Sequence, residues 1–236
     1  MAAQYDYDWT EALREYRLAV ACGGVGTAEQ VGCLIAVLTP LKRVEEAVGT
    51  AQAAIAADPF APTPRLALAL ALASSGEQEK AISELIRLTE LHEKLFVGHL
   101  HLGVNYTNLG RTAAAISALE EAVRLGPWHD VCKALLAWNY LQAGDRERCD
   151  DLLRRLPAEN RGDWVFHILS GDFDHAAAAL ERLIEIRAPG VTLLPCTKIF
   201  EKFCLSPQGR GILQKINLLE THHLRETPQG LVDQMS

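Results

Sequence analysis

Histidines, cysteines and carboxylates are the residues of this chain that could do chemistry, as metal ligands, nucleophiles or acid–base groups. His99 and His101 are two residues apart on an expected helix. Their side chains therefore point to different faces, which is poor geometry for a shared metal. His222 and His223 lie in a polar C-terminal stretch, where exposure to solvent is the expected role. The histidines therefore predict no metal site.

Six cysteines are spread along the 236 residues without any Cys-x-x-Cys pair. That density is too low for a disulfide scaffold, so reduced and buried thiols are expected. The sequence repeats with a period of 34 residues, described below, and each repeat is expected to contain two helices. Cys132 and Cys149 fall on the two helices of one repeat, and Cys149 takes a position that three other repeats fill with Ala. Packing is the expected role of Cys149. A redox or metal switch built on Cys132 and Cys149 stays open as a remote alternative.

Catalytic motifs do not emerge from the remaining residues. The segment from Cys22 to Gly26 is rich in glycine, but it lacks the Lys of a phosphate-binding loop and follows a helix, so it is interpreted as a linker. A Gly-x-Ser-x-Gly sequence is absent. Carboxylates such as Glu120 and Glu121 are expected on exposed faces, whereas an acid–base pair needs a desolvated cleft. We therefore expect no enzyme and no cofactor.

Composition favours helices and limits the partners. Hydrophobic residues make up 49% of the chain and aromatic residues only 6%, and the apolar residues are mostly Ala and Leu, which favour helices over strands. A net charge of −7 argues against direct binding of nucleic acid. No charge-free stretch reaches the ~18 to 20 residues that cross a bilayer, and the acidic N-terminus is unlike a secretory signal. We expect no membrane insertion and a cytoplasmic location.

A period of 34 residues organises the chain. Large apolar residues recur at this spacing, as Leu34, Leu68, Leu102 and Leu136. Glycines recur as Gly76, Gly110 and Gly144. Small residues recur as Ala47, Ala81, Ala115 and Cys149. Each unit is therefore expected to be two helices joined by a tight turn at Gly, with a small residue where the helices approach closely.

This unit resembles the tetratricopeptide repeat. The unit 96–129 carries eight residues of the family pattern: Leu102, Gly103, Tyr106, Gly110, Ala115, Leu119, Ala122 and Pro127. Units run without a gap at 28–61, 62–95, 96–129 and 130–163, and a unit with a trimmed first helix follows at 164–190. The first unit has Lys42 where the others have the turn glycine, so its turn is expected to be distorted. The resemblance implies an all-α fold, a right-handed α-α superhelix.

Both ends depart from the period. An unpaired second helix is expected at 8–21, which must pack on the next unit and leave one edge open, so we expect that the chain begins inside a longer array. After the array of residues 1–190, residues 191–219 are expected to form a short helical cap. One cap helix is centred near Phe200, and another begins at Ser206 and Pro207 as N-cap and first turn. Residues 220–236 are expected to be a loose polar tail.

The order of segments also resembles a narrower group, the bacterial tetratricopeptide arrays linked to winged-helix, nucleotide cyclase or protein kinase domains. The features that carry this resemblance are Tyr7-Asp8-Trp9 at the start, Gly171-Asp172 before an Ala-rich helix, and the closing stretch from Phe200 to Leu218. The resemblance implies a sensor or adaptor role in a bacterial regulatory protein.

The concave wall of stacked first helices is the usual partner site of such an array. By the resemblance, its groove-facing positions are Gly32, Ala36, Leu66, Leu70, Leu100, Val104, Asn108, Ala134, Trp138 and Gln142. They lack the Lys and Asn set with which chaperone-tail receptors of this family clamp a carboxylate. We expect an apolar groove for a peptide or helix of a protein partner, with Trp138 as the hot spot. Two alternatives stay open: these residues only pack the array, or the unpaired N-terminal helix makes the chain self-associate.

Overall fold

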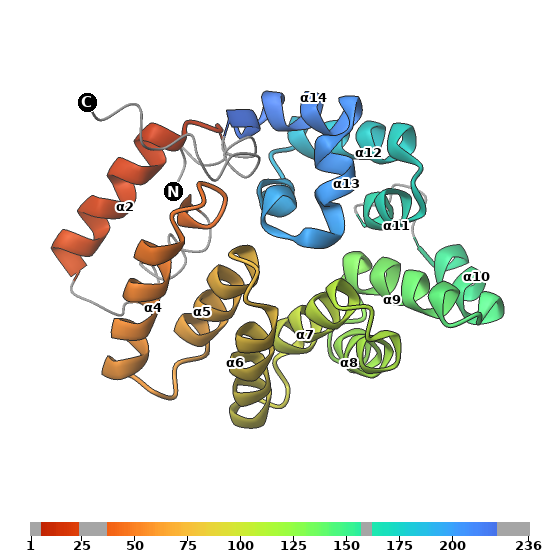
Figure 1. The fold of residues 1–236 in the computed structure, drawn as a ribbon, viewed down its shortest axis with the longest axis horizontal. Helices are drawn as coiled ribbons and strands as arrows, with labels where there is room; N and C mark the ends of the chain where they lie inside the picture. Colours follow the sequence, from red (N-terminus) through yellow and green to blue (C-terminus); the bar gives the residue numbers. More distant parts are fainter. Residues whose placement is uncertain (1–5, 24–36, 157–161, 221–236) are drawn as a thin grey trace.

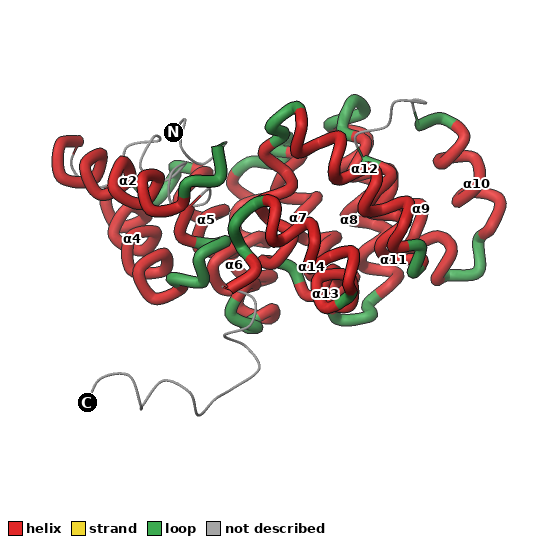
Figure 2. Tube along the Cα trace, turned by 90° about the horizontal axis from the view of Figure 1, so that it is seen from above, coloured by secondary structure: helices red, strands yellow, loops and turns green. Residues whose placement is uncertain are grey.

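The computed structural model describes residues 6–23, 37–156 and 162–220. Helices fill these residues, none of which lies in a β-strand, and they follow one another in packed pairs (Figure 1). Figure 2, seen from above, shows the short loops that join them. The helices are α2 (Trp9–Gly23), α4 (Val44–Ala57), α5 (Pro62–Ser74), α6 (Gln78–Leu91), α7 (Phe96–Asn108), α8 (Thr112–Leu125), α9 (Asp130–Gln142), α10 (Arg146–Arg154), α11 (Asp163–Ser170), α12 (Phe173–Glu185), η2 (Pro189–Cys196), η3 (Lys198–Phe200), α13 (Glu201–Leu205) and α14 (Pro207–Lys215). The predicted all-α solenoid is confirmed.

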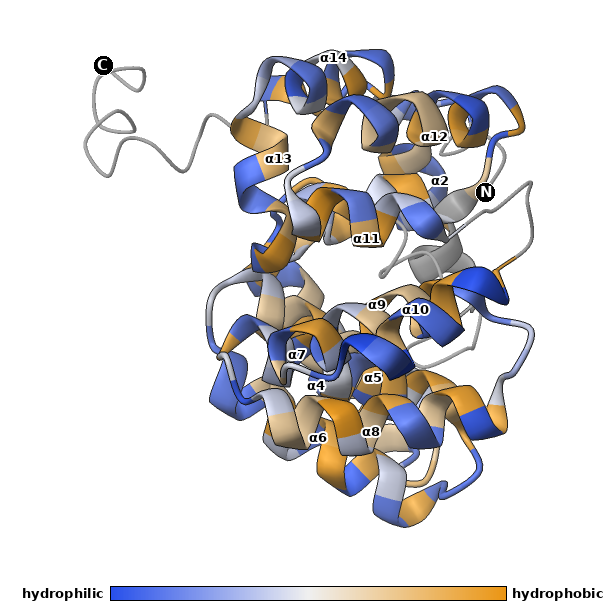
Figure 3. Ribbon diagram, turned by 90° about the vertical axis from the view of Figure 1, so that its right-hand side faces the viewer, coloured by the Kyte–Doolittle hydropathy of each residue, from blue (hydrophilic) through white to orange (hydrophobic). Residues whose placement is uncertain are grey.

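Small residues let paired helices approach closely. The period's small residues are all buried in the structure: Ala47, Ala81, Ala115 and Cys149. At Gly103 in α7, an added Cβ would collide with the side chain of Leu119 in α8, so this contact requires Gly. Figure 3 shows apolar stretches along α6, α8, α9 and α11 and hydrophilic residues in many connecting turns. The 34-residue pattern therefore describes the contacts between helices.

The turns inside the units share one backbone geometry. Gly76, Gly110 and Gly144 all have positive φ values, and the next N–H donates to the carbonyl five residues earlier, a common way to end a helix. These hydrogen bonds are Glu77 to Leu72, Arg111 to Tyr106 and Asp145 to Tyr140, each of 2.9 Å. The glycines occur where the left-handed backbone conformation needs them.

The first unit keeps this turn without a glycine. Lys42 itself takes a left-handed conformation, with φ of 58°. The N–H of Arg43 donates to the carbonyl of Leu38 over 3.0 Å, as in the other turns. The expected distortion is therefore wrong, because the backbone geometry is conserved at the cost of about 1 kcal/mol of strain. The first helix expected for this unit falls mainly on residues 24–36, outside the described residues.

The helices follow an arc that brings the C-terminal cap back to the start of α2 (Figure 1). The indole Nε1 of Trp9 donates a buried hydrogen bond of 2.7 Å to the carbonyl of Ile216. The amide of Asn217 donates to the carbonyl of Tyr7 over 3.1 Å. An ion pair joins Asp6 to Arg187. The edge expected to be open at α2 is thus closed at the N-terminal end of this helix by the cap.

The cap differs from the expected pair of helices in its first half. Residues 189–196 and 198–200 form two 3-10 helices, and only five residues of α-helix follow in α13. Pro195 lies inside η2, where its missing N–H and its ring oppose an α-helix. The second cap helix starts as predicted, because α14 begins at Pro207 and the hydroxyl of Ser206 accepts the N–H of Gly209 over 3.1 Å.

Candidate partner-binding groove

The inner wall of the arc is built from the first helices α5, α7, α9 and α11 (Figure 1). Part of this wall is covered by the chain's own cap, since η2 packs on α5 and η3 packs on α7 and α11. Val191, Leu194 and Phe200 of the cap are buried in one apolar cluster with Leu100 of α7. The cap therefore takes up a stretch of the predicted groove.

Several predicted groove residues serve packing in this structure. Leu100 is buried in the cluster that contains Phe200, and Val104 is half-buried against that cluster. Leu66 is half-buried against a second cluster, formed by α5 to α8. Leu70 is half-buried and Ala134 is buried. Gly32 and Ala36 lie outside the described residues.

Trp138, Asn108 and Gln142 keep accessible surface on the inner wall, as does the half-buried Leu70. Trp138 of α9 is half-buried, and its ring lies edge-on to Phe166 of α11 with centroids 6.2 Å apart. Gln142 of α9 is exposed, and Asn108 of α7 is half-buried. The structure links these two helices through the buried amide of Asn139, which donates to the hydroxyl of Thr107 over 2.9 Å. Asn139, next to Trp138 in sequence, therefore joins α9 to α7, while the Trp138 ring itself contacts α11.

Four cysteines are buried in the structure: Cys132, Cys149, Cys196 and Cys204. Burial raises the pKa of Cys132 to about 12 and also raises the pKa of Cys149. The Sγ of Cys132 lies 3.3 Å from Nδ1 of His129, the spacing of a nucleophile and its base. A thiol with a raised pKa stays protonated near neutral pH and is a poor nucleophile and metal ligand. This environment opposes both a catalytic and a redox role.

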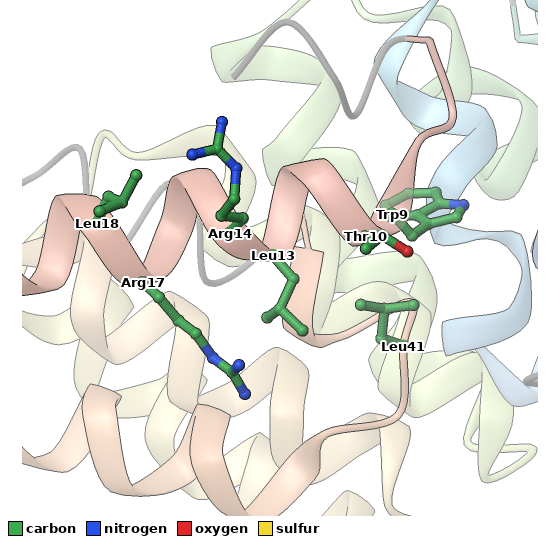
Figure 4. A pocket seen from close by; sticks show the side chains of 7 residues that line it. All are labelled: Trp9, Thr10, Leu13, Arg14, Arg17, Leu18 and Leu41. Carbon is green, nitrogen blue, oxygen red and sulfur yellow. The ribbon is translucent and has the colours of Figure 1, made fainter.

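A hollow lies along α2 (Figure 4). It has a volume of about 570 Å³ and is lined by Trp9, Thr10, Leu13, Arg14, Arg17, Leu18 and Leu41. Leu13 and Leu41 both pack against the buried Ala12 and Val37, whereas Leu18 remains 50% exposed. Arg14 pairs with Glu11 of the same helix. The sequence predicted an exposed edge at α2. It did not predict that Leu41 lines the hollow, because Leu41 is not one of the residues that recur every 34 positions.

The helix pairs, their shared turns and the arc define a solenoid of α-helical repeats. A family model described as tetratricopeptide repeat matches residues 108–164. The chain is similar in fold to the crystal structure of MamA, with a TM-score of 0.51 and 18% identity, over 65% of this chain and 89% of that one. It is also similar to Cut9 in the structure of the APC/C hetero-tetramer Cut9–Hcn1, with a TM-score of 0.57 and 14% identity, over 95% of this chain and 45% of that one.

These comparisons show the tetratricopeptide-type fold. A search among curated proteins found no match by sequence. Within the described residues, no helix is long and apolar enough to span a membrane.

Proposed function

We propose that this chain is a non-catalytic scaffold for protein–protein contacts, which binds a peptide or a helix of a protein partner on the inner wall beside the cap. Trp138 carries this proposal. Its large amphipathic ring keeps accessible surface, while the neighbouring positions Leu100 and Val104 are taken up by the cap. Aromatic residues of this kind supply much of the binding energy of interfaces. The exposed Gln142 provides an amide group for the backbone of the partner, beside the half-buried Asn108.

The partner in this proposal is a protein and not a nucleic acid, because a chain with a net charge of −7 repels phosphate. We place the scaffold in the cytoplasm, as the sensor or adaptor part of a bacterial regulatory protein. The resemblance of the segment order to such regulators supports this role. Burial raises the pKa of both Cys132 and Cys149, which makes a redox switch built on these two thiols the weaker alternative.

Replacement of Trp138 by Ala is expected to weaken partner binding at least tenfold, which corresponds to about 1.4 kcal/mol. The measurement is affinity capture from the native cell with the tagged chain, followed by quantification of each captured protein by mass spectrometry. The matched control is Trp128→Ala, since Trp128 is 69% exposed on the loop after α8. A partner lost from Trp138→Ala and kept by Trp128→Ala supports the groove. Unchanged capture by a destabilised Trp138→Ala chain contradicts it.

Self-association through α2 is a second candidate, favoured by the exposed Leu18 beside the hollow of Figure 4. In this candidate, Leu18 packs against a second copy of the chain. Leu18→Glu places a charge in that contact, so we expect it to convert a dimer of the native chain into a monomer. Light scattering after size exclusion, at several protein concentrations, measures the mass. Ile86→Glu, at a partly exposed position of α6, is the control that should leave the dimer intact. A native chain that is monomeric at every concentration excludes this candidate.

A further inference from the structure

Two histidines and an aspartate converge at the turn between α11 and α12. Asp172 is the N-cap of α12, His167 lies in the last turn of α11, and His175 lies in the first turn of α12. Oδ2 of Asp172 lies 2.7 Å from Nδ1 of His175 and 3.4 Å from Nδ1 of His167. The two imidazole rings stack with centroids 5.3 Å apart. One ligand atom of each residue lies within 4.8 Å of the other two.

The backbone turn alone does not require these imidazoles. Gly171 has a left-handed conformation, and the N–H of Asp172 donates to the carbonyl of His167 over 2.8 Å. The turn between α9 and α10 has the same bond, from Asp145 to Tyr140, and the same aspartate cap, in which Oδ1 of Asp145 accepts the N–H of Arg148. Identical caps therefore form with and without histidine.

The same two positions face each other in both turns. Between α9 and α10 they hold Tyr140 and Arg148, whose guanidinium lies 4.3 Å from the centre of the tyrosine ring. Between α11 and α12 they hold His167 and His175 beside a carboxylate. Where the α9–α10 turn has a tyrosine ring and an arginine, the α11–α12 turn has two imidazoles, a side-chain type that can bind metals.

The distances suit a transition metal. With zinc–nitrogen bonds of 2.0–2.1 Å and tetrahedral angles, two ligand atoms are about 3.3 Å apart. Oδ2 of Asp172 and Nδ1 of His167 are 3.4 Å apart, whereas the 2.7 Å between Oδ2 of Asp172 and Nδ1 of His175 is a hydrogen bond that the metal would replace. The side chain of His175 is 74% exposed and can adjust. Imidazole ligands favour zinc, nickel and copper over magnesium and calcium.

We propose that His167, Asp172 and His175 bind one divalent transition metal ion, of which Zn²⁺ is the test case. Three protein ligands leave the fourth position of a tetrahedral site open to water or to a side chain of a partner. The ion joins α11 to α12, the two helices of the unit that the cap covers. Because all three ligands meet only in the folded chain, the metal also stabilises the fold.

The test titrates Zn²⁺ into the full chain by isothermal calorimetry, with His222→Gln and His223→Gln as background so that the tail does not bind the metal. One Zn²⁺ per chain is expected. His175→Gln removes one ligand at an exposed position, and Asp172→Asn removes the charged ligand while Asn still caps the helix. Each change should weaken zinc binding at least tenfold. The matched control Asp145→Asn changes the equivalent cap of α10 and should bind zinc as the parent does.

A parent chain that binds no Zn²⁺ overturns the proposal, and so does equal affinity of Asp172→Asn and Asp145→Asn. Cobalt replaces zinc in a second measurement, because its absorption spectrum reports the ligand type. A cobalt spectrum without a sulfur-to-metal charge-transfer band supports nitrogen and oxygen ligands. Appearance of that band would assign the bound metal to cysteines and would overturn the site.

Discussion

Replacement of Trp9 by Ala is expected to lower the free energy of unfolding by about 3–5 kcal/mol, the range for a large buried side chain. Trp9 is only 7% exposed and packs in the cluster that joins α2 to the cap. Its indole also supplies the buried hydrogen bond to the carbonyl of Ile216. The change therefore removes packing and a donor at the contact between the two ends of the arc. Urea unfolding followed by circular dichroism measures the loss.

Two variants separate these contributions. Trp9→Phe keeps an aromatic ring but leaves the carbonyl of Ile216 without its donor, which should cost about 1–3 kcal/mol. Trp128→Ala removes an exposed indole and should change stability by less than about 1 kcal/mol. If Trp9→Ala were as mild as Trp128→Ala, the contact between α2 and the cap would not stabilise the fold.

Gly209→Ala is expected to destabilise the chain by about 3 kcal/mol, at the upper end of the cost of overpacking. An added Cβ would overlap the carbonyl oxygen of Phe203 and crowd the Cα of Cys204, which are backbone atoms and cannot rotate away. The N–H of Gly209 also completes the cap with Ser206. Relief of the overlap would therefore require α14 to move away from α13. Thermal unfolding measures the effect as a lowered Tm.

Gly211→Ala is the matched control in the same helix. A Cβ at this position meets no atom within 4 Å. Alanine also favours a helix over glycine by up to about 1 kcal/mol, so Gly211→Ala should raise the Tm. Opposite signs for two Gly→Ala changes two residues apart would establish the close contact between α13 and α14. Equal effects would contradict it.

Much of the fold could be predicted because repeats make the same contact many times. Ala81 and Ala115 are small because paired helices approach closely there. The turn glycines and the Ser-Pro start of α14 follow from the local backbone needs of helix ends. Lys42 escaped this reasoning, because the hydrogen bonds of its turn enforce a conformation that its side chain disfavours. The first half of the cap differs from the predicted α-helix because Pro195 lies inside it and opposes regular α-helical hydrogen bonds.

The surroundings of the candidate groove could not be predicted in the same way, since they depend on contacts between residues that are distant in sequence. Trp9 and Ile216 are separated by 207 positions, and no period links them. The cap covers Leu100 for the same reason, because the C-terminal segment folds back against helices from the middle of the chain. The histidine–aspartate cluster was missed for another reason. His167, Asp172 and His175 lie on two helices, so only the sharp turn at Gly171 brings them together, and a search for two histidines on one helix does not find them.

The contact between α2 and the cap also changes how the repeats depend on one another. In an open solenoid each unit touches only its neighbours, and unfolding can begin by fraying at either end. Here the first described helix is tied to the last, through Trp9 and Ile216 and through Tyr7 and Asn217. The first and last helices therefore contact each other as well as their neighbours in sequence, so unfolding of one end also removes hydrogen bonds made by the other end. Insertion of one more unit between α2 and the cap would separate these residues and remove the hydrogen bonds that tie the two ends together.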